Sequence, residues 1–438
     1  MKQSLLTIAF GCLVLASTLG VRADSPQDQL QTWIAGHAAA VRSVDASDED
    51  FSDLEPLAKA IGYAPVVELG EPGHGAGTSF AAKVRLIKFL HQRLGFNILV
   101  WESGMYDVSL SDAGMRGNDD PITAARRGIF QLWSGAEEVR PLFDYIKASQ
   151  TTAQPLHMAG FDMQVTADGS MDRFASDLRA FVQAIKMPAL RDEMAVLADQ
   201  ALAARKQLFA SNFAAESDLT PLDQAAGRLL KALRRQRAAF LAVHDAKSIA
   251  WMEHWIENMR LDARQRYDSR HSIGSEVARE NRRDARNFEN LRWLIRQGYP
   301  GKKFIVWAHN VHVMKAGYAA DFRAVHAEPQ PGDMKTTGGL LADLLGSRVY
   351  SIGMTAYQGK DALATGGPAT VIDPAPADSF EGRIHALGQP FVFLDLRTLH
   401  APLSARMPKY EANAIADPAR VYDGIFYIDR MEAATKLN

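Results

Sequence analysis

The chain has 438 residues, of which 47% are hydrophobic and 23% are charged, a composition typical of a globular protein with a large core. Its 49 basic and 51 acidic residues give a formal net charge of −2 without a basic stripe, which argues against nucleic acid as a partner. The single cysteine, Cys12, lies within the first 23 residues. Residues 24–438 therefore contain no disulfide and no cysteine nucleophile.

Residues 1–23 have the pattern of a secretory signal peptide. Lys2 provides a positive start, residues 5–19 are mostly apolar, and Val21-Arg22-Ala23 is similar to a small-residue cleavage site. The apolar run is shorter than the roughly 20 residues that span a bilayer, which favours cleavage over a membrane anchor. We therefore expect a periplasmic or secreted protein whose mature chain, residues 24–438, does not associate with a membrane.

The mature chain is predicted to start with a helix at residues 27–44, after which short apolar runs alternate with helical patterns. A helix at residues 79–94, capped by Thr78 or Ser79, is predicted after the first apolar run. Seven runs are predicted as strands, at residues 66–69, 96–101, 156–161, 304–307, 348–352, 390–394 and 425–428. Short apolar strands separated by helices are typical of a parallel sheet covered on both faces.

Two segments interrupt this alternation. From about residue 171 to 297 the sequence has an amphipathic helical pattern without a convincing strand, which predicts a helical insertion packed over the sheet or beside the active cleft. Residues 358–380 are rich in Gly, Pro, Ala and Asp and are predicted to form a loop.

Polar residues follow the first five predicted strands. Ligands bind at the carboxyl ends of the strands in an open parallel sheet, so we expect these residues to converge on one edge. His74 is the strongest single case because it lies between two glycines that leave it unshielded, whereas each of the others is also consistent with a solvated or structural role. In chain order the residues are Glu71, His74, Glu102, Ser103, Asp162, Gln164, His309, Asn310, His312 and Thr355.

The segment after the first strand, GEPGHGAGTSF at residues 70–80, is open to three interpretations. A dinucleotide-binding loop is rejected because the third glycine of the fingerprint is missing and a glutamate would repel pyrophosphate. A site for zinc, manganese or iron is the second, although no His-Glu-x-x-His signature is present. Its ligands would be Glu71, His74, Glu102, His309 and His312.

Hydrolysis without a metal is the third interpretation. No Gly-x-Ser-x-Gly elbow is present, so an ordinary serine esterase is not expected. An imidazole with a pKa of about 6.5 suits His74 to take a proton from water. Glu71 and Glu102 would then hold its ring, and His309 or His312 would stabilise the oxyanion or protonate the leaving alkoxide.

Four motifs in order resemble those of the erythromycin esterase family. The resemblance extends over residues 65–355, and the last motif is fairly specific by itself. The departures are Asn287-Phe288, where the family usually has Met-Ala, Ser79, where it usually has an acid, and a first loop that is about one residue longer than in the family. The motifs are Gly70-Glu71-x-x-His74-Gly75, Val100-Trp101-Glu102, Arg283-Asp284 with Asn290-Leu291-Arg292-Trp293-Leu294, and Trp307-Ala308-His309-Asn310-x-His312.

The resemblance implies a three-layer α/β fold with a helical insertion, and a small-molecule substrate that is a carboxylic ester or lactone. A macrolide, and hence antibiotic resistance, is one candidate. His74 would be the base, without a cofactor, in one cleft with Glu71, Glu102, His309 and His312. Arg85 and Asp162 are predicted to bind substrate, with Lys83 as the alternative to Arg85. A metal-dependent hydrolase and a non-enzymatic metal- or haem-binding protein remain alternatives, and the oligomeric state is left open.

Overall fold

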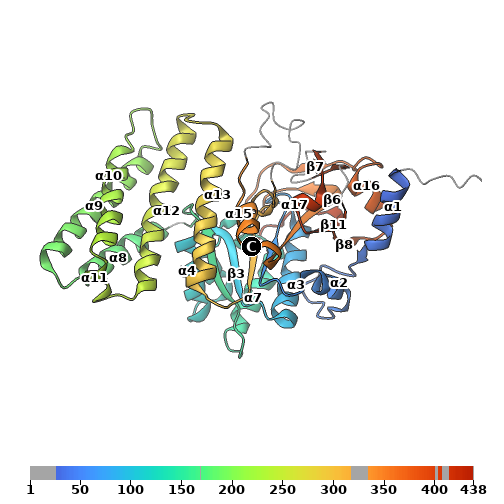
Figure 1. Cartoon of the computed structure of the whole chain (residues 1–438), viewed down its shortest axis with the longest axis horizontal. Helices are drawn as coiled ribbons and strands as arrows, with labels where there is room; N and C mark the ends of the chain where they lie inside the picture. The colour runs from blue at the N-terminus through green and yellow to red at the C-terminus, as the bar shows by residue number, and fades with distance from the viewer. Residues whose placement is uncertain (1–25, 168, 317–333, 400–402, 407–413, 438) are drawn as a thin grey trace, which may run out of the picture.

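In the computed structural model the described residues are 26–167, 169–316, 334–399, 403–406 and 414–437, and a nine-stranded sheet forms their centre (Figure 1). The predicted signal peptide lies outside these residues. Along the sheet the order is β1-β8-β11-β6-β2-β5-β3-β4, and β7 pairs with β6. The six strands from β11 to β4 in this order are parallel, whereas β1, β7 and β8 pair antiparallel. The predicted α/β class with a mostly parallel sheet is confirmed.

All seven predicted strands are present, some with different bounds. The strands of the sheet are β1 Ala39–Ala40, β2 Val66–Leu69, β3 Ile98–Gly104, β4 His157–Asp162, β5 Phe304–Trp307, β6 Val349–Asp361, β7 Thr370–Ile372, β8 Phe391–Asp395 and β11 Gly424–Met431. A separate antiparallel pair consists of β9 Leu403–Ala405 and β10 Ala414–Ala416.

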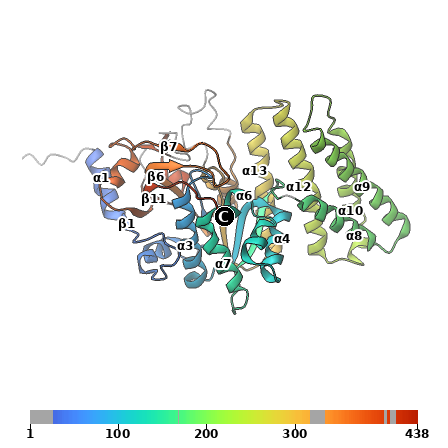
Figure 2. The ribbon, with the colours of Figure 1, turned by 180° about the vertical axis from the view of Figure 1, so that it is seen from behind.

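Helices cover both faces of the sheet because neighbouring strand residues point to opposite sides. Val67 packs in one hydrophobic core, with α2, α3 and α7, whereas Val66 packs in another, with α1, α15 and α16. Figure 2 views the side of α3 and α7. The helices outside the insertion are α1 Pro26–His37, α2 Glu55–Ile61, α3 Gly77–Leu94, α4 Met105–Arg116, α5 Pro121–Arg126, α6 Gln131–Ser134, α7 Arg140–Ser149, α14 Asn310–Val313, α15 Thr337–Leu345, α16 Phe380–His385 and α17 Pro418–Val421.

Six helices between β4 and β5 form a bundle beside the sheet, and most of it lies to the left in Figure 1. The bundle has a hydrophobic core of its own, with Phe174, Met194, Leu222 and Ile256 among its buried residues. Its helices are α8 Ser170–Gln183, α9 Pro188–Ala210, α10 Thr220–Arg235, α11 Arg237–Leu241, α12 Ala246–Arg270 and α13 Glu276–Trp293. Of the helices in the described part of the chain, none is long and apolar enough to cross a membrane.

Three predictions of local structure were wrong because tertiary contacts override local propensity. The helix predicted for residues 27–44 ends at His37, after which the chain forms the edge strand β1 and pairs with β8. Helix α3 begins at Gly77 without a side-chain cap, since the Thr78 hydroxyl accepts a hydrogen bond from the Glu432 backbone N–H instead. The loop predicted for residues 358–380 contains the end of β6, which β11 pairs as far as Gly359, and all of β7.

Candidate active site

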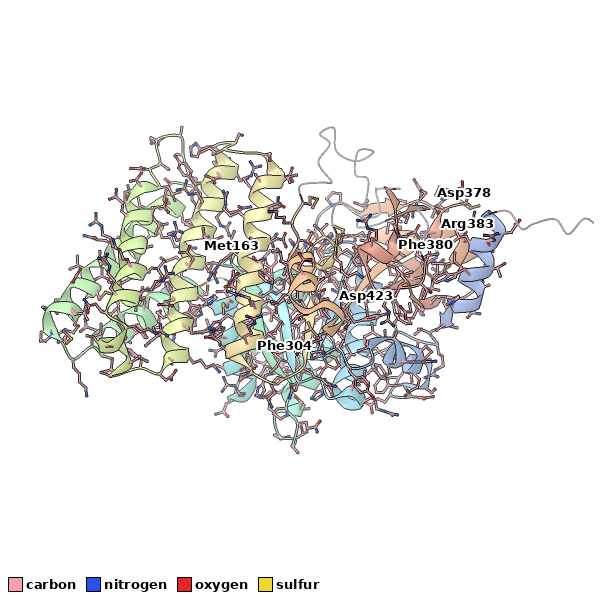
Figure 3. The ribbon with its side chains drawn as sticks, viewed as in Figure 1. Met163, Phe304, Asp378, Phe380, Arg383 and Asp423 are labelled. Atoms are coloured by element: carbon pink, nitrogen blue, oxygen red, sulfur yellow. The ribbon has the colours of Figure 1, made fainter. Side chains whose placement is uncertain are left out.

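The sheet brings the predicted polar residues to one edge. In Figure 3, Phe304 marks the amino end of a strand, at the start of β5, and Met163 marks the carboxyl end of a strand, just after β4. Because β2, β5, β3 and β4 are parallel neighbours, the residues at their carboxyl ends lie next to one another. Glu71 and His74 follow β2, and His309 follows β5. Glu102 lies near the end of β3 and Asp162 at the end of β4.

The loop that carries His74 packs closely against the end of β6. A β-carbon at Gly73 or at Gly75 would collide with the Asp361 carboxylate, and at Gly75 also with the Ala362 backbone. Gly75 is therefore required by its close approach to the backbone, whereas at Gly73 only the Asp361 side chain would have to shift, and neither glycine has a positive φ. Their absent side chains let the loop bring His74 up to the sheet edge.

Glu71 accepts three hydrogen bonds from the side chains around it. Its Oε1 lies 3.0 Å from His74 Nδ1 and 3.0 Å from the indole Nε1 of Trp133. Its Oε2 accepts from Lys83 Nζ at 2.5 Å, and the same ammonium donates to the Ala308 carbonyl at 3.1 Å. Glu71, Lys83 and Trp133 are all fully buried. We call these three residues and His74 the Glu71 cluster.

His74 is the member of the Glu71 cluster that reaches solvent, with 34% of its side chain exposed. Because Nδ1 faces a carboxylate, this nitrogen carries the proton, and Nε2 has no hydrogen-bond partner among the described residues. Burial lowers the pKa of the imidazole, but the hydrogen bond to Glu71 and the charge of Glu102 raise it by more. The pKa of His74 therefore lies above its ordinary value.

For the lysine of this cluster, the effect of burial on the pKa is larger than the effect of the neighbouring carboxylate. It lowers the pKa of Lys83 to about 8, although the charge of Glu71 opposes the change. The ammonium also lies 4.4 Å from the ring centroid of Trp307, where a cation–π contact offsets part of its desolvation. At neutral pH Lys83 is therefore mostly protonated and neutralises the buried Glu71 carboxylate.

A second group of charges, which we call the Arg283 cluster, consists of Glu102, Asp162, Arg283, Asp284 and His312. Arg283 Nη2 donates to Asp162 at 2.6 Å and to Glu102 at 3.0 Å. His312 lies between two carboxylates, with Nδ1 2.9 Å from Asp284 and Nε2 3.1 Å from Glu102. Burial opposes both charges, but His312 and Arg283 hold the pKa of Glu102 well below its usual range, and Asp284 and Glu102 hold the pKa of His312 well above.

His309 connects the two clusters. Its backbone N–H donates to Glu102 Oε2 at 2.7 Å, and its Nδ1 accepts from the Val311 backbone N–H at 3.1 Å. The acceptor role of Nδ1 places the ring proton on Nε2, which lies 3.3 Å from the Pro72 carbonyl. The ring centroids of His309 and His74 are 5.1 Å apart. The site thus places an N–H donor beside an imidazole whose second nitrogen is a potential base.

The sequence matches the family profile described as erythromycin esterase over residues 91–431. The chain belongs to the erythromycin esterase family. The "Putative hydrolase YbfO" of Bacillus subtilis (strain 168) is 28% identical over 409 residues, which cover 88% of this chain and 85% of that protein. The "Erythromycin esterase type II" of Escherichia coli is 22% identical over 331 residues, 72% and 74% of the two chains.

Solved structures share the fold. A crystal structure of a Bacillus cereus protein has a TM-score of 0.72 and 19% identity, covering 95% of this chain and 100% of its own. A mutant of the erythromycin esterase EreC in its open conformation has a TM-score of 0.69 and 17% identity, covering 91% and 98%. The family match and the hydrolase relatives identify this erythromycin esterase family member as an ester-acting hydrolase.

Most of the predicted site residues come together. Asp162 belongs to the Arg283 cluster, where its buried carboxylate is engaged by the guanidinium. Arg85 does not come to this edge and has to be corrected as a substrate-binding residue. Its buried guanidinium donates to Asp53 and to backbone carbonyls of residues 43–50. The predicted residues that do meet are Glu71, His74, Glu102, Asp162, His309 and His312.

Three residues of the site were not assigned a role from the sequence. Arg283 and Asp284 stood in a matched motif, so their place in the family pattern was a usable signal. Trp133 lies in the four-residue helix α6, far from any matched motif, and had no local signal. The basic residue of α3 that reaches the site is Lys83, the alternative to Arg85.

The donors of the site do not fit the alternative of a bound metal. Glu102 and His312 are paired with each other and with Arg283 or Asp284, and the Nδ1 lone pair of His309 accepts from the backbone. A guanidinium in the centre of the Arg283 cluster would also repel a cation. Within the described ranges no group of three or more His, Cys, Asp or Glu residues is arranged to hold a metal ion.

Proposed function

We propose that this protein cleaves a carboxylic ester or lactone by a water molecule that His74 deprotonates. The observation that supports this most directly is the state of the His74 imidazole. Nδ1 is held by a buried carboxylate while Nε2 is without a partner in the described structure, on a side chain that is 34% exposed. A general base needs this combination of a fixed ring and an accessible lone pair.

The proton transfers then balance in two steps. Nε2 of His74 takes a proton from water as the water oxygen attacks the ester carbonyl, and Glu71 stabilises the imidazolium that forms. His309, with its proton on Nε2, is placed to donate to the developing oxyanion, a contribution of about 3 kcal/mol to the barrier. The imidazolium returns its proton to the leaving alkoxide, which restores the neutral base and releases acid and alcohol.

The Arg283 cluster supports this chemistry from behind the reacting groups. Glu102 binds the backbone N–H of His309 and so holds this residue opposite His74. Arg283 neutralises Glu102 and Asp162, which would otherwise be two buried carboxylates at the same edge. In this proposal no residue of the Arg283 cluster transfers a proton, and the reaction needs no metal or other cofactor.

The substrate class that we propose is an ester or lactone of a small molecule, with macrolides as one candidate. A relative named erythromycin esterase type II, 22% identical over 331 residues, supports the macrolide. Asn287 is one of the departures from the family pattern, and its Oδ1 accepts a hydrogen bond from the Met163 backbone N–H at 2.8 Å behind the site. This contact explains the asparagine as a support of the chain after β4 rather than as a substrate contact.

The purified mature protein is to be assayed against aryl esters, simple lactones and macrolides, with and without a chelator. We expect hydrolysis of at least one ester or lactone at a rate that the chelator does not change. Loss of activity with the chelator and recovery with one metal would support the metal-dependent alternative instead. A coloured protein that hydrolyses none of these substrates would point to the binding-protein alternative.

We also propose that the protein is exported and that residues 1–23 are removed. The support is the signal-like pattern of these residues alone. Expression of the full chain in a bacterium, followed by N-terminal sequencing of the extracytoplasmic protein, is expected to find Asp24 as the first residue. A full-length protein in the cytoplasmic fraction would contradict export.

A further inference from the structure

The indole of Trp133 makes a contact that the proposed reaction does not use. Its Nε1 donates to Glu71 Oε1 at 3.0 Å, the same oxygen that receives His74 Nδ1. The ring of Trp133 also meets the His74 imidazole edge-on, with centroids 5.6 Å apart. Trp133 therefore touches both members of the pair that prepares the base.

The three donors leave the Glu71 carboxylate a single orientation. Lys83 holds Oε2, while Trp133 and His74 share Oε1, and the glutamate has no exposed surface. A rotated carboxylate would leave a buried N–H donor without an acceptor, which is costly away from water. The indole contact also spreads the negative charge of Oε1 over two donors, which weakens the pull of the carboxylate on an imidazolium at His74.

We propose that Trp133 is a positioning residue whose indole N–H orients Glu71 toward His74 and limits how tightly the carboxylate holds the imidazolium. This inference rests on the proposed function of His74 as the base. Without the N–H donor, Oε1 would interact with His74 alone. The imidazolium would become more stable, and the base would stay protonated to higher pH.

The test compares Trp133→Phe with Trp101→Phe, which is a matched control. Trp101 is fully buried in the same aromatic cluster, with its ring centroid 6.1 Å from that of Trp133. Its Nε1 has no hydrogen-bond partner in the described part of the structure. Both variants lose the same indole volume, but only one loses a hydrogen bond to Glu71.

We expect Trp133→Phe to lower kcat about 10- to 100-fold at an unchanged KM, as for a lost hydrogen bond to a charged group. The acidic limb of its kcat/KM profile should move to higher pH relative to both the wild type and Trp101→Phe. Both variants retain the titratable groups around His74, so a difference between the limbs is due to the missing N–H. These groups are Glu71, Lys83, Glu102, Arg283, His309, His312 and Asp361.

A second replacement guards against a misfolded Trp133→Phe. Substitution of Trp133 by 3-benzothienylalanine replaces the N–H with sulfur and keeps the ring shape, so it should produce the same shift of the limb. Equal limbs and equal kcat values for Trp133→Phe and Trp101→Phe would show that Trp133 is only a packing residue. The same conclusion would follow if the benzothienyl variant behaved as the wild type.

A direct titration of His74 separates this inference from the proposed function. The pKa of the imidazole is to be measured by NMR with labelled histidine in the wild type and in Trp133→Phe. A higher pKa in the variant supports the effect of the indole N–H on the Glu71–His74 pair, and an equal or lower pKa overturns it. Full activity in His74→Asn would overturn the proposed function alone.

Discussion

The Glu71 and Arg283 clusters lie side by side at the carboxyl edge of the sheet and differ in one respect. In the Arg283 cluster the charges are paired with one another, and the side chains are buried except that of Arg283, which is 13% exposed. In the Glu71 cluster the carboxylate is equally buried, but the chain of contacts ends at His74, whose Nε2 is without a described partner and whose side chain is partly exposed. Charges that are paired with one another stabilise the fold, whereas general-base catalysis requires a group with an accessible lone pair.

This difference also explains why both clusters perturb pKa values while only one is proposed to react. The pKa of Glu102 is far below its usual range and that of His312 far above, so both stay charged over the physiological range. Despite burial, the pKa of His74 is raised above its ordinary value by the hydrogen bond to Glu71 and the charge of Glu102, and Nε2 of this imidazole has no hydrogen-bond partner among the described residues. A perturbed pKa identifies a functional residue here only together with an accessible atom.

The largest expected effect is that of His74→Asn, which removes the base of the Glu71 cluster. We expect kcat to fall about 10²- to 10⁴-fold, the usual contribution of a general base, with an unchanged unfolding transition. The measurement is ester hydrolysis together with thermal unfolding. His37→Asn, at an exposed histidine of α1, is the control and should keep full activity. Full activity of the His74→Asn variant would show that the Glu71 cluster does not provide the general base.

The next effect is that of Arg283→Met, which tests whether the Arg283 cluster is structural. The change leaves the buried Asp162 carboxylate without its cation and Glu102 with His312 as its remaining cationic partner, which should cost about 3–5 kcal/mol in the free energy of unfolding. Arg292→Met is the control on the same helix, because Arg292 and Glu289 are 42% and 41% exposed and their pair should contribute at most about 1 kcal/mol. Similar urea midpoints for the two variants would contradict the prediction.

The smallest effect is a shift in pH dependence. Only the neutral imidazole of His74 accepts a proton, so activity should be lost as the pH falls through a pKa above about 6.5. Glu71→Gln removes the charge and the ionic hydrogen bond that raise this pKa, so the acidic limb of kcat/KM should move to lower pH. A limb that stays in place would show that Glu71 does not set the pKa of His74.

Glu68→Gln provides the matched control for this shift. Glu68 lies on β2 three residues before Glu71 and is also fully buried, and burial raises the pKa of its carboxyl well above the usual value. A neutral carboxyl resembles an amide in size, so this variant should leave the acidic limb where it is in the wild type.

Much of the fold was predictable because its signals are local. Apolar runs of four to six residues marked the strands, and the polar residues at their ends followed from the rule that parallel strands present their carboxyl ends at one edge. The end of the first helix and the start of α3 were not predictable, because strand β8 and the Glu432 backbone compete for those residues from far along the chain.

Within the site, residue types and strand ends in the amino-acid chain sufficed to name Glu71, His74, Glu102, His309 and His312 as neighbours. The partners of these residues emerged only in three dimensions. Lys83 and Arg85 are two positions apart, which is about 200° around a helix, so one contacts Glu71 and the other Asp53. Trp133 reaches Glu71 across 62 positions. Such contacts depend on how distant elements pack, and no local pattern of residues encodes them.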